Sequence, residues 1–369
     1  MWRRVLALAI KEFLVLLKDP RSRSVIIVPP FVQLLVFGFA ATYDLNDVPF
    51  AVYCEDNGVD AQELLAGFRH SRHFSEAAAI RHDREIAPLI DSKEVLLVVR
   101  IGPRFSRDLR HRRPAAVQAI VDGRDSNTAL VALGYVRNIV DRFNREWSAR
   151  HGLPGPSARL QPRSWFNPNL ESRWFIVPGI VGLLTLVVTM LVTALSVARE
   201  REQGTFDQTL VAPFRPGEIL LGKAIPGFLI GLAEASGIIL AAVYGFGIPL
   251  LGDLTTLYTG LTLFLIAAVG VGLMISSLAV TQQQGLLGAF LFLVPAIILS
   301  GFATPIMNMP PLLQRITVVN PLRYFLVILR GVFLEGTSFD LLLDQFWPLA
   351  VIGAVTLALA TWLFRRRLY

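Results

Sequence analysis

Two long apolar runs, separated by one short charged segment, constrain this chain more than any other feature of its sequence. Residues 175–198 carry no charged side chain, and residues 224–251 carry only Glu234. Each run exceeds the roughly 20 apolar residues that a helix needs to cross a lipid bilayer. The charged segment between them, residues 199–223, must lie at a membrane surface, because charges and unpaired backbone groups are costly in hydrocarbon.

Composition favours a polytopic membrane protein over a nucleic-acid-binding protein. The chain is 53% hydrophobic and 17% charged, and the charged share is below the roughly 25% of an average soluble protein. The formal charge is +7, but 19 of the 35 Lys and Arg residues fall in residues 43–174, among 17 acidic residues. Most of the others flank apolar segments, where basic residues orient membrane helices. We therefore predict no nucleic-acid partner.

The predicted fold class is an α-helical polytopic membrane protein with six transmembrane helices and an inserted extracytoplasmic α/β domain. The expected crossings are residues 24–43, 174–198, 224–251, 254–280, 285–302 and 346–364. An amphipathic helix in residues 1–23 is expected to lie along the cytoplasmic interface, with its basic residues toward lipid headgroups. The remaining parts are the α/β domain, a cytoplasmic loop or short helix, outer re-entrant helices and a cytoplasmic tail, at residues 44–173, 199–223, 303–345 and 365–369 respectively.

The α/β domain is predicted from short β-rich runs that end in turn sequences and from helical patterns between and after them. The expected strands are residues 48–54, 94–101 and 115–121. The expected helices are residues 61–68, 86–91, 105–110 and 126–147, the last capped by Asp125 or Ser126. The single cysteine, Cys54, excludes an intramolecular disulfide and is expected as a small buried side chain in a strand.

A metal site is conceivable in this domain, because all five histidines lie there and His70 and His73 would share one helical face. No third ligand stands at a recognisable spacing from them. We therefore favour solvated surface histidines and predict no bound metal.

The distribution of basic residues orients the predicted helices. With the N-terminus inside, the expected cytoplasmic parts hold 13 Lys and Arg residues, whereas the short outer loops hold only Arg315, Arg323 and Arg330. Cytoplasmic loops carry the excess of basic residues, and a long domain is translocated largely regardless of its charge. Both termini are thus expected in the cytoplasm, and residues 44–173 are expected outside.

Residues 217–223 match most of a phosphate-binding loop, G-x-x-x-x-G-K. Ala224 stands where that loop needs a hydroxyl to hold magnesium, no strand precedes the match, and a predicted membrane helix follows it. We interpret the match as chance. The chain is therefore predicted to have no catalytic residue and no cofactor of its own, and any ATP must be hydrolysed by another polypeptide.

Three separated motifs resemble those of ABC-2 type transporter permeases. They are SVAREREQGTFDQTLVAP at residues 196–213, LSGFATPIMNMPPLLQ at residues 299–314 and NPLRYF at residues 320–325. The resemblance covers essentially the whole chain, including EDNG at residues 55–58 and WFNPNL at residues 165–170. Within the family, the chain is most similar to bacterial inner-membrane permeases that carry a large periplasmic domain after the first helix.

The resemblance implies a type V exporter-like fold and an exporter half without a nucleotide site. Two permeases, identical or siblings, would pair, and each would dock an ABC ATP-binding subunit that holds the ATP and magnesium. It also implies efflux of drugs or other amphipathic xenobiotics, with a periplasmic adaptor protein as a further partner. The alternatives are export of a lipid, a polysaccharide or ions, or a membrane-anchored sensor or assembly factor that uses the outer domain.

By this resemblance, the charged segment couples the permease to its ATPase. The expected coupling residues are Arg199, Glu200, Arg201, Glu202, Gly204, Thr205, Pro213 and Pro216. Alternating charges can cap the helix end and dock a polar partner surface, and the prolines would stiffen the return of the chain. The alternative is an ordinary charged membrane anchor.

A transport path is expected along the second crossing, where Thr185, Thr189 and Thr193 form a hydroxyl stripe. These hydroxyls could line a cavity, but we favour bonding back to their own helix carbonyls. Small residues on the third crossing more often mark tight helix packing. Glu234 lies near the middle of that crossing, where a carboxylate needs a polar partner, water or a proton, so we predict contact with polar groups or water.

An outer gate is expected in residues 303–345, where short apolar stretches dip back into the outer leaflet. Its candidate residues are Pro305, Pro310, Asn320, Pro321 and Arg323. Asn320 is expected to cap the helix that opens at Pro321. Arg323 and Arg330 are expected as interfacial anchors near the headgroups.

Overall fold

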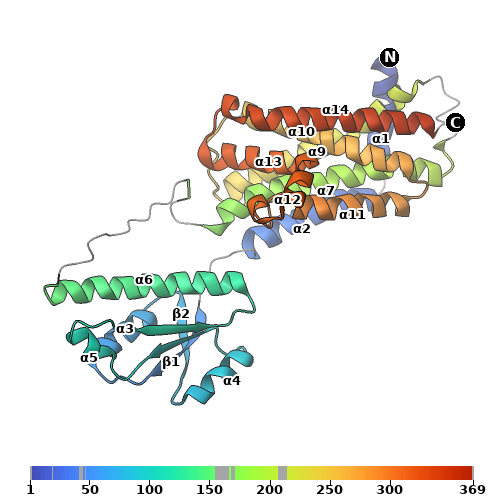
Figure 1. The fold of residues 1–369 in the computed structure, drawn as a ribbon. Coiled ribbons are helices and arrows are strands. Elements are labelled where there is room, and N and C mark those ends of the chain that lie inside the picture. The colour runs from blue at the N-terminus through green and yellow to red at the C-terminus, as the bar shows by residue number, and fades with distance from the viewer. Residues whose placement is uncertain are drawn as a thin grey trace. The chain divides into compact units, whose positions relative to one another are not determined.

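The computed structural model describes residues 2–18, 20–40, 45, 47–153, 166–167, 171–206 and 214–367. The chain forms two compact units. One is Thr42–Arg163, and the other combines Met1–Ala41 with Ser164–Tyr369. Figure 1 shows a small α/β unit and a bundle of long helices.

The α/β unit is built on a four-stranded sheet with the order β2-β1-β3-β4. The strands are β1 (Val48–Cys54), β2 (Phe74–Ala79), β3 (Leu97–Ile101) and β4 (Val117–Val121). β1 pairs in parallel with β2 and β3, and β3 pairs antiparallel with β4. The helices are α3 (Val59–Arg69), α4 (Ile86–Asp91), α5 (Phe105–Arg110) and α6 (Ser126–Arg150).

The central strand β1 is buried on both faces of the sheet. Phe50 and Val52 belong to one apolar core, and Ala51 and Tyr53 belong to a second core on the opposite face. Alternate residues of a strand point to opposite faces, so a strand covered on both sides reads as a continuous apolar run. This is why the strand at residues 48–54 was predictable from sequence.

Three predicted strands are confirmed, but the edge strand β2 was missed. Its sequence, FSEAAA, is mostly exposed and rich in Ala and Glu, residues that are depleted in strands. The predicted helices are confirmed, and Asp125 caps α6 by accepting a hydrogen bond from the Thr128 amide at 3.3 Å. Cys54 is half-buried, and its thiol donates to the Asp56 carbonyl at 3.0 Å.

The helical unit begins with α1 (Trp2–Lys18) and α2 (Pro20–Ala40). Its long helices are α7 (Ser172–Glu202), α9 (Pro216–Leu240), α10 (Leu254–Leu278), α11 (Gln282–Ile298) and α14 (Leu343–Arg366). Two shorter helices, α12 (Pro311–Ile316) and α13 (Pro321–Arg330), precede α14. α10 packs against α7, α9, α13 and α14 (Figure 1), and so forms the centre of the bundle.

Four of the described helices are long and apolar enough to cross a membrane: Ser172–Glu202, Pro216–Gly245, Leu254–Leu278 and Phe339–Arg366. The predicted crossings at residues 24–43 and 285–302 correspond to shorter apolar helices, Ile27–Phe39 and Gln282–Ile298. A bent pair, Pro311–Val319 and Pro321–Glu335, meets at 85° and falls within the predicted outer re-entrant segment. The count of six crossings therefore stays a prediction.

The helix boundaries around the charged segment differ from the predicted ones. α7 continues to Glu202, four residues beyond the predicted crossing, and α9 begins at Pro216, eight residues before the predicted one. Proline is favoured at the first position of a helix. The Arg215 amide donates to Glu218 Oε2 at 2.9 Å, which fixes this helix start.

Candidate functional site

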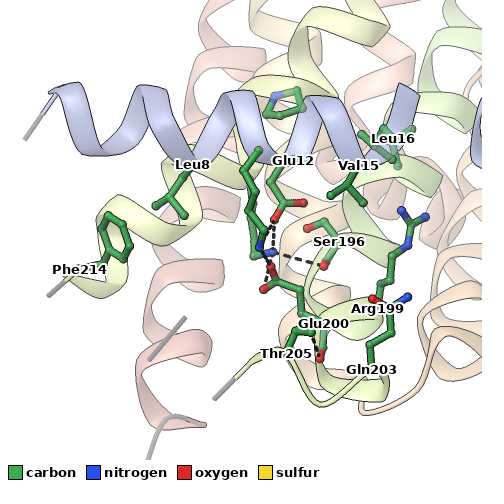
Figure 2. Close-up of a pocket in the computed structure, with 14 residues that line it drawn as sticks. Leu8, Glu12, Val15, Leu16, Ser196, Arg199, Glu200, Gln203, Thr205 and Phe214 are labelled. Carbon is green, nitrogen blue, oxygen red and sulfur yellow. Dashed lines mark hydrogen bonds and ion pairs between the residues drawn. The ribbon is translucent and has the colours of Figure 1, made fainter. Parts of the chain in front are cut away.

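Four charged side chains from three helices meet at the end of the bundle where α7 stops and α9 begins. Lys11 and Glu12 come from α1, Glu200 from α7 and Lys223 from α9 (Figure 2). We call these four residues the charge cluster.

Signs alternate around the charge cluster, so each charge contacts two opposite charges. Lys223 Nζ lies 2.9 Å from Glu12 Oε1 and 2.8 Å from Glu200 Oε2. Lys11 Nζ forms an ion pair with Glu200 and lies 3.6 Å from Glu12 Oε1. The cluster is neutral overall.

Three of the four side chains are nearly removed from solvent. Lys223 is 3% exposed, Glu200 8% and Glu12 10%, whereas Lys11 is 46% exposed. Burial of an unpaired charge is strongly unfavourable, so each buried member depends on the others. Burial lowers the pKa of Lys11, but its hydrogen bonds and electrostatic attraction to Glu200 and Glu12 together outweigh burial and leave the pKa raised.

The helix α1 reaches the charge cluster through its buried face. Val5, Leu8, Glu12 and Leu16 are buried at spacings of three and four residues, which place them on one face. Gly222 makes room for this contact, since a Cβ there would lie 2.6 Å from Leu8 Cβ. One face of α1 therefore packs on α9, and the position of this helix along the cytoplasmic interface stays a prediction.

A second apolar stripe on α1 remains exposed. Its members are Trp2, Leu6, Ile10, Leu14 and Leu17, each at least 43% exposed. This stripe is available to lipid, as expected for an interfacial helix. α1 thus presents one face to the bundle and another to its surroundings.

The end of α7 is closed by Gly204, which has a φ of +66°. Glycine adopts this left-handed conformation without strain, and it commonly ends a helix. The Thr205 amide donates to the Glu200 carbonyl at 3.0 Å, and the Gly204 amide donates to the Arg201 carbonyl at 3.2 Å. Glu200 therefore lies in the last turn of α7, which these hydrogen bonds close.

The other charges of this segment bind neighbouring helices of the same chain. Arg201 Nη1 donates to the carbonyls of Ser277 and Ala279, at 3.1 and 3.0 Å, and so caps the end of α10. Glu202 Oε2 accepts from the Gln282 amide at 2.8 Å at the start of α11. Glu200, Arg201 and Glu202 are thus all engaged within the chain, and the docking of a partner surface by this segment stays a prediction.

A cavity of about 400 Å³ adjoins the charge cluster (Figure 2). Its walls come from α1, α7 and α9, with Thr205 and Phe214 from the segment between the last two. Ser196 Oγ in its wall is buried and has no hydrogen-bond partner among the described residues. Of the predicted coupling residues, Arg199, Glu200 and Thr205 line this cavity, whereas Pro213 lies outside the described residues.

The hydroxyl stripe of α7 is fully buried against α9 and α10. Thr193 Oγ1 donates to the Thr189 carbonyl at 2.7 Å, as predicted for a threonine in a helix. A Cβ at Gly227 or Gly272 would lie 2.3 or 1.8 Å from the Thr193 side chain. The small residues therefore serve close helix packing, as predicted.

Thr185 and Thr189 do not form the predicted hydrogen bonds to carbonyls of their own helix. Both side chains are fully buried, and their hydroxyl oxygens have no hydrogen-bond partner in the described part of the chain. Glu234 resembles them, since both its carboxylate oxygens are buried without such a partner. The predicted hydrogen bond between Glu234 and another polar side chain is not found among the described residues, so we still expect a bound water or a proton on its carboxylate.

The candidate gate residues lie around the bent helix pair. Asn320 Oδ1 accepts from the Leu322 amide at 3.1 Å, which confirms the predicted cap of the helix that opens at Pro321. Asn320 Nδ2 donates to the Ala296 carbonyl at 2.7 Å and so joins α13 to α11. Arg323 donates to Thr317 Oγ1, and Pro305 and Pro310 precede two short helices.

The sequence of the chain matches a known family over most of its length. The profile described as ABC-2 family transporter protein matches residues 21–362. The chain belongs to the ABC-2 transporter family. The resemblance of the three motifs to ABC-2 permeases is thereby confirmed.

The chain is similar to three proteins from Escherichia coli strain K12. The probable multidrug ABC transporter permease YbhR is 40% identical over 368 residues, which is 100% of both chains. The probable multidrug ABC transporter permease YbhS is 32% identical over 372 residues, covering 99% of this chain and 97% of that protein. The inner membrane transport permease YhhJ is 28% identical over 367 residues, with the same coverage.

Sequence reasoning did not identify Lys11 and Glu12 as part of the charge cluster. Glu12 and Lys223 are separated by 211 positions, so no local pattern links them. One signal was present, because Glu12 interrupts the apolar face of α1 that Val5, Leu8 and Leu16 define. A carboxylate in that position implies a buried basic partner.

Proposed function

We propose that this chain is the permease subunit of an ATP-driven ABC-2 exporter and that a separate ATP-binding subunit docks at the charged end of the bundle. The observation that carries the proposal is the charge cluster. It ties the end of α7 and the start of α9 to α1, with three of its four side chains nearly buried. A displacement imposed on the segment between α7 and α9 would therefore move three helices together.

In this proposal, the phosphate-loop-like match at residues 217–223 does not hold a nucleotide. Residues 217–223 lie within α9, and Lys223 is buried in ion pairs with Glu12 and Glu200. A phosphate-binding lysine must instead reach its nucleotide from a loop. In this proposal, ATP and magnesium are held by the partner subunit.

Two permeases, identical or siblings, would enclose the path for cargo. The chain would cross the bacterial inner membrane six times with both termini in the cytoplasm and residues 44–173 in the periplasm. The excess of basic residues in the expected cytoplasmic parts supports this orientation. Thr185, Thr189, Thr193 and Glu234 are the proposed path, and the bent pair after α11 is the proposed outer gate.

Drugs or other amphipathic molecules are the proposed cargo. The similar proteins YbhR and YbhS are named as probable multidrug permeases, which supports this choice. Export of a lipid, a polysaccharide or ions is the alternative within transport, and a sensor or assembly factor is the alternative outside it. A periplasmic adaptor protein would dock on the α/β unit.

Site-specific crosslinking in intact cells tests where the ATP-binding subunit docks. Cys54 is first replaced by serine, and Gln203→Cys then places a single thiol at an exposed position beside the charge cluster. The matched control is Met307→Cys. Met307 is 89% exposed and follows the C-terminal end of α11. We expect a thiol crosslinker to capture an ABC ATP-binding subunit at residue 203 and not at residue 307. Capture at neither position, or equal capture at both, contradicts the proposal.

A further inference from the structure

The guanidinium of Arg330, the last residue of α13, has one unsatisfied edge. Its Nε and Nη2 atoms are buried, and neither has a hydrogen-bond partner among the residues that the structure describes. These two nitrogens point their N–H groups in parallel along the same edge of the planar guanidinium. That fork matches the paired oxygens of a carboxylate or a phosphate.

In two other arginines of this chain, the same two nitrogens donate hydrogen bonds to a carboxylate. In the α/β unit, Arg69 Nε and Nη2 donate to the two carboxylate oxygens of Glu76, at 2.5 and 3.2 Å. Arg124 Nε lies 2.9 Å from Asp122 Oδ1, and its Nη2 lies 2.7 Å from Asp122 Oδ2. Arg330 presents the same donor pair, and no acidic residue in the described part of the chain accepts from it.

Aromatic packing holds the Arg330 guanidinium in place. Its central carbon lies 4.2 Å from the centroid of the Phe175 ring, in the first turns of α7. Phe175 stacks on Phe302, with ring centroids 6.4 Å apart and planes inclined by 5°. Phe302 in turn fills the space over Gly179, where a Cβ would lie 2.3 Å from its ring. These aromatic contacts therefore fix the orientation of the Arg330 guanidinium.

This arrangement differs from the simple interfacial anchor expected from the sequence. An anchoring arginine extends its charged head into water, whereas two donors of Arg330 are shielded from solvent. Burial of a cation with unpaired donors is unfavourable unless an acceptor is supplied. Glu335, the next acidic residue along the chain, is exposed, and its Oε2 accepts a hydrogen bond from Thr337 Oγ1 at 3.1 Å. The acceptor must then come from outside the described chain.

We propose that Arg330 binds the phosphate group of a membrane phospholipid at the end of the bundle opposite to the charge cluster. Phe175 and Glu200 stand near the two ends of α7, which separates the two sites by most of that helix. Val327, one turn before Arg330 on α13, is 43% exposed, and Phe175 is 36% exposed. These apolar surfaces suit an acyl chain beside the bound headgroup, and the site is distinct from the proposed coupling function.

Native mass spectrometry of the full chain, purified in detergent and stripped of lipid, tests this site. The probes are phosphatidylglycerol, a diacylglycerol with the same acyl chains but no phosphate, and inorganic phosphate alone. We expect wild-type protein to retain phosphatidylglycerol but neither of the other two probes. Arg330→Gln should weaken this retention about tenfold, as expected for the loss of a charged hydrogen-bonded pair. Arg330→Lys, which keeps the charge but not the fork, should also weaken it.

The control is Arg107→Gln, at an exposed position of α5 in the α/β unit, which should leave lipid retention unchanged. If Arg330→Gln does not fold, Arg330→Lys and the comparison of probes on wild-type protein decide the outcome. Equal retention by Arg330→Lys or Arg330→Gln and wild type would overturn the proposal. So would equal binding of diacylglycerol, which indicates acyl-chain binding only, or displacement of the lipid by inorganic phosphate, which indicates a free-phosphate site.

Discussion

Lys223 Nζ lies 2.8 Å from Glu200 Oε2, and this ion pair joins the first turns of α9 to the last turn of α7. The same ammonium lies 2.9 Å from Glu12 Oε1 on α1, so one buried lysine connects three helices. Its side chain is only 3% exposed. The stability of this end of the bundle should therefore depend on charge balance within the cluster.

Lys223→Met should destabilise the protein strongly, because Glu12 and Glu200 would then share only the partly exposed Lys11. Removal of one partner from a buried ion pair costs about 3–5 kcal/mol. Thermal unfolding of the purified chain in detergent measures the effect. The control is Lys18→Met at an exposed position of α1, which should change little.

The double variant Glu12→Gln/Lys223→Met should recover most of that loss. It removes one charge of each sign and leaves the Lys11 and Glu200 pair intact. A double variant as unstable as Lys223→Met alone would show that packing of the lysine, and not charge balance, holds this end together.

Gly272→Ala should loosen the contact between α7 and α10. The added Cβ would lie 1.8 Å from Thr193 Oγ1, and overpacking of this kind costs about 1–3 kcal/mol. Thr193→Ala in the same chain should relieve the clash. Gly237→Ala on α9 is the matched control, since a Cβ there meets nothing within 4 Å. Equal thermal stability of Gly272→Ala and Gly237→Ala would contradict the packing described for this stripe.

Asn320→Ala should destabilise the first turn of α13 by about 1 kcal/mol, the usual effect of losing a helix cap. Asn320→Asp keeps the oxygen that accepts from Leu322 but loses the donor to the Ala296 carbonyl. Hydrogen exchange followed by mass spectrometry should show faster exchange in α13 for the alanine variant. Unchanged exchange in that helix would mean that Asn320 does not act as its cap.

The contact of Asp56 with α5 should weaken at acid pH. Burial raises the pKa of Asp56, but hydrogen bonds from the Ser106 and Gly58 amides outweigh burial and leave the pKa lowered. A lowered pKa in the folded state contributes stability above the unfolded value of about 3.9. That stability is lost as the pH falls through the folded-state pKa.

Hydrogen exchange of the Gly58 and Ser106 region in the full chain measures this effect. Protection should be constant from pH 7 to about pH 5 after correction for the intrinsic exchange rate, and should fall below about pH 4. Asp56→Asn should show lower protection than wild type above about pH 5, with no such fall at acid pH. A wild-type profile parallel to that of Asp56→Asn would exclude the carboxylate as the cause.

The sequence predicted those elements whose signal is local. β1 reads as an apolar run because both of its faces are buried, and Asn320-Pro321 marks a helix start through residue preferences alone. β2 was missed because an exposed edge strand needs no apolar residues. Its pairing with β1 depends on tertiary structure.

The candidate site was predicted in position but not in its contacts. The charged segment at residues 199–202 was identified, yet its partners Lys11, Glu12, Ser277 and Gln282 lie far away in sequence. The unsatisfied edge of Arg330 could not be predicted from the sequence either, because it depends on the described residues that surround the guanidinium in the fold. Contacts between distant segments require the fold.

Coupling between ATP hydrolysis and export in proteoliposomes tests the central claim most directly. The permease is reconstituted with its ATP-binding subunit, and transport of an amphipathic fluorescent drug is measured against ATP hydrolysed. We predict that Glu12→Gln/Lys223→Met keeps ATP hydrolysis but loses most export, because α9 is no longer tied to α1 and α7. Wild-type export per ATP in this folded variant, or ATP hydrolysis by the permease alone, would contradict the account.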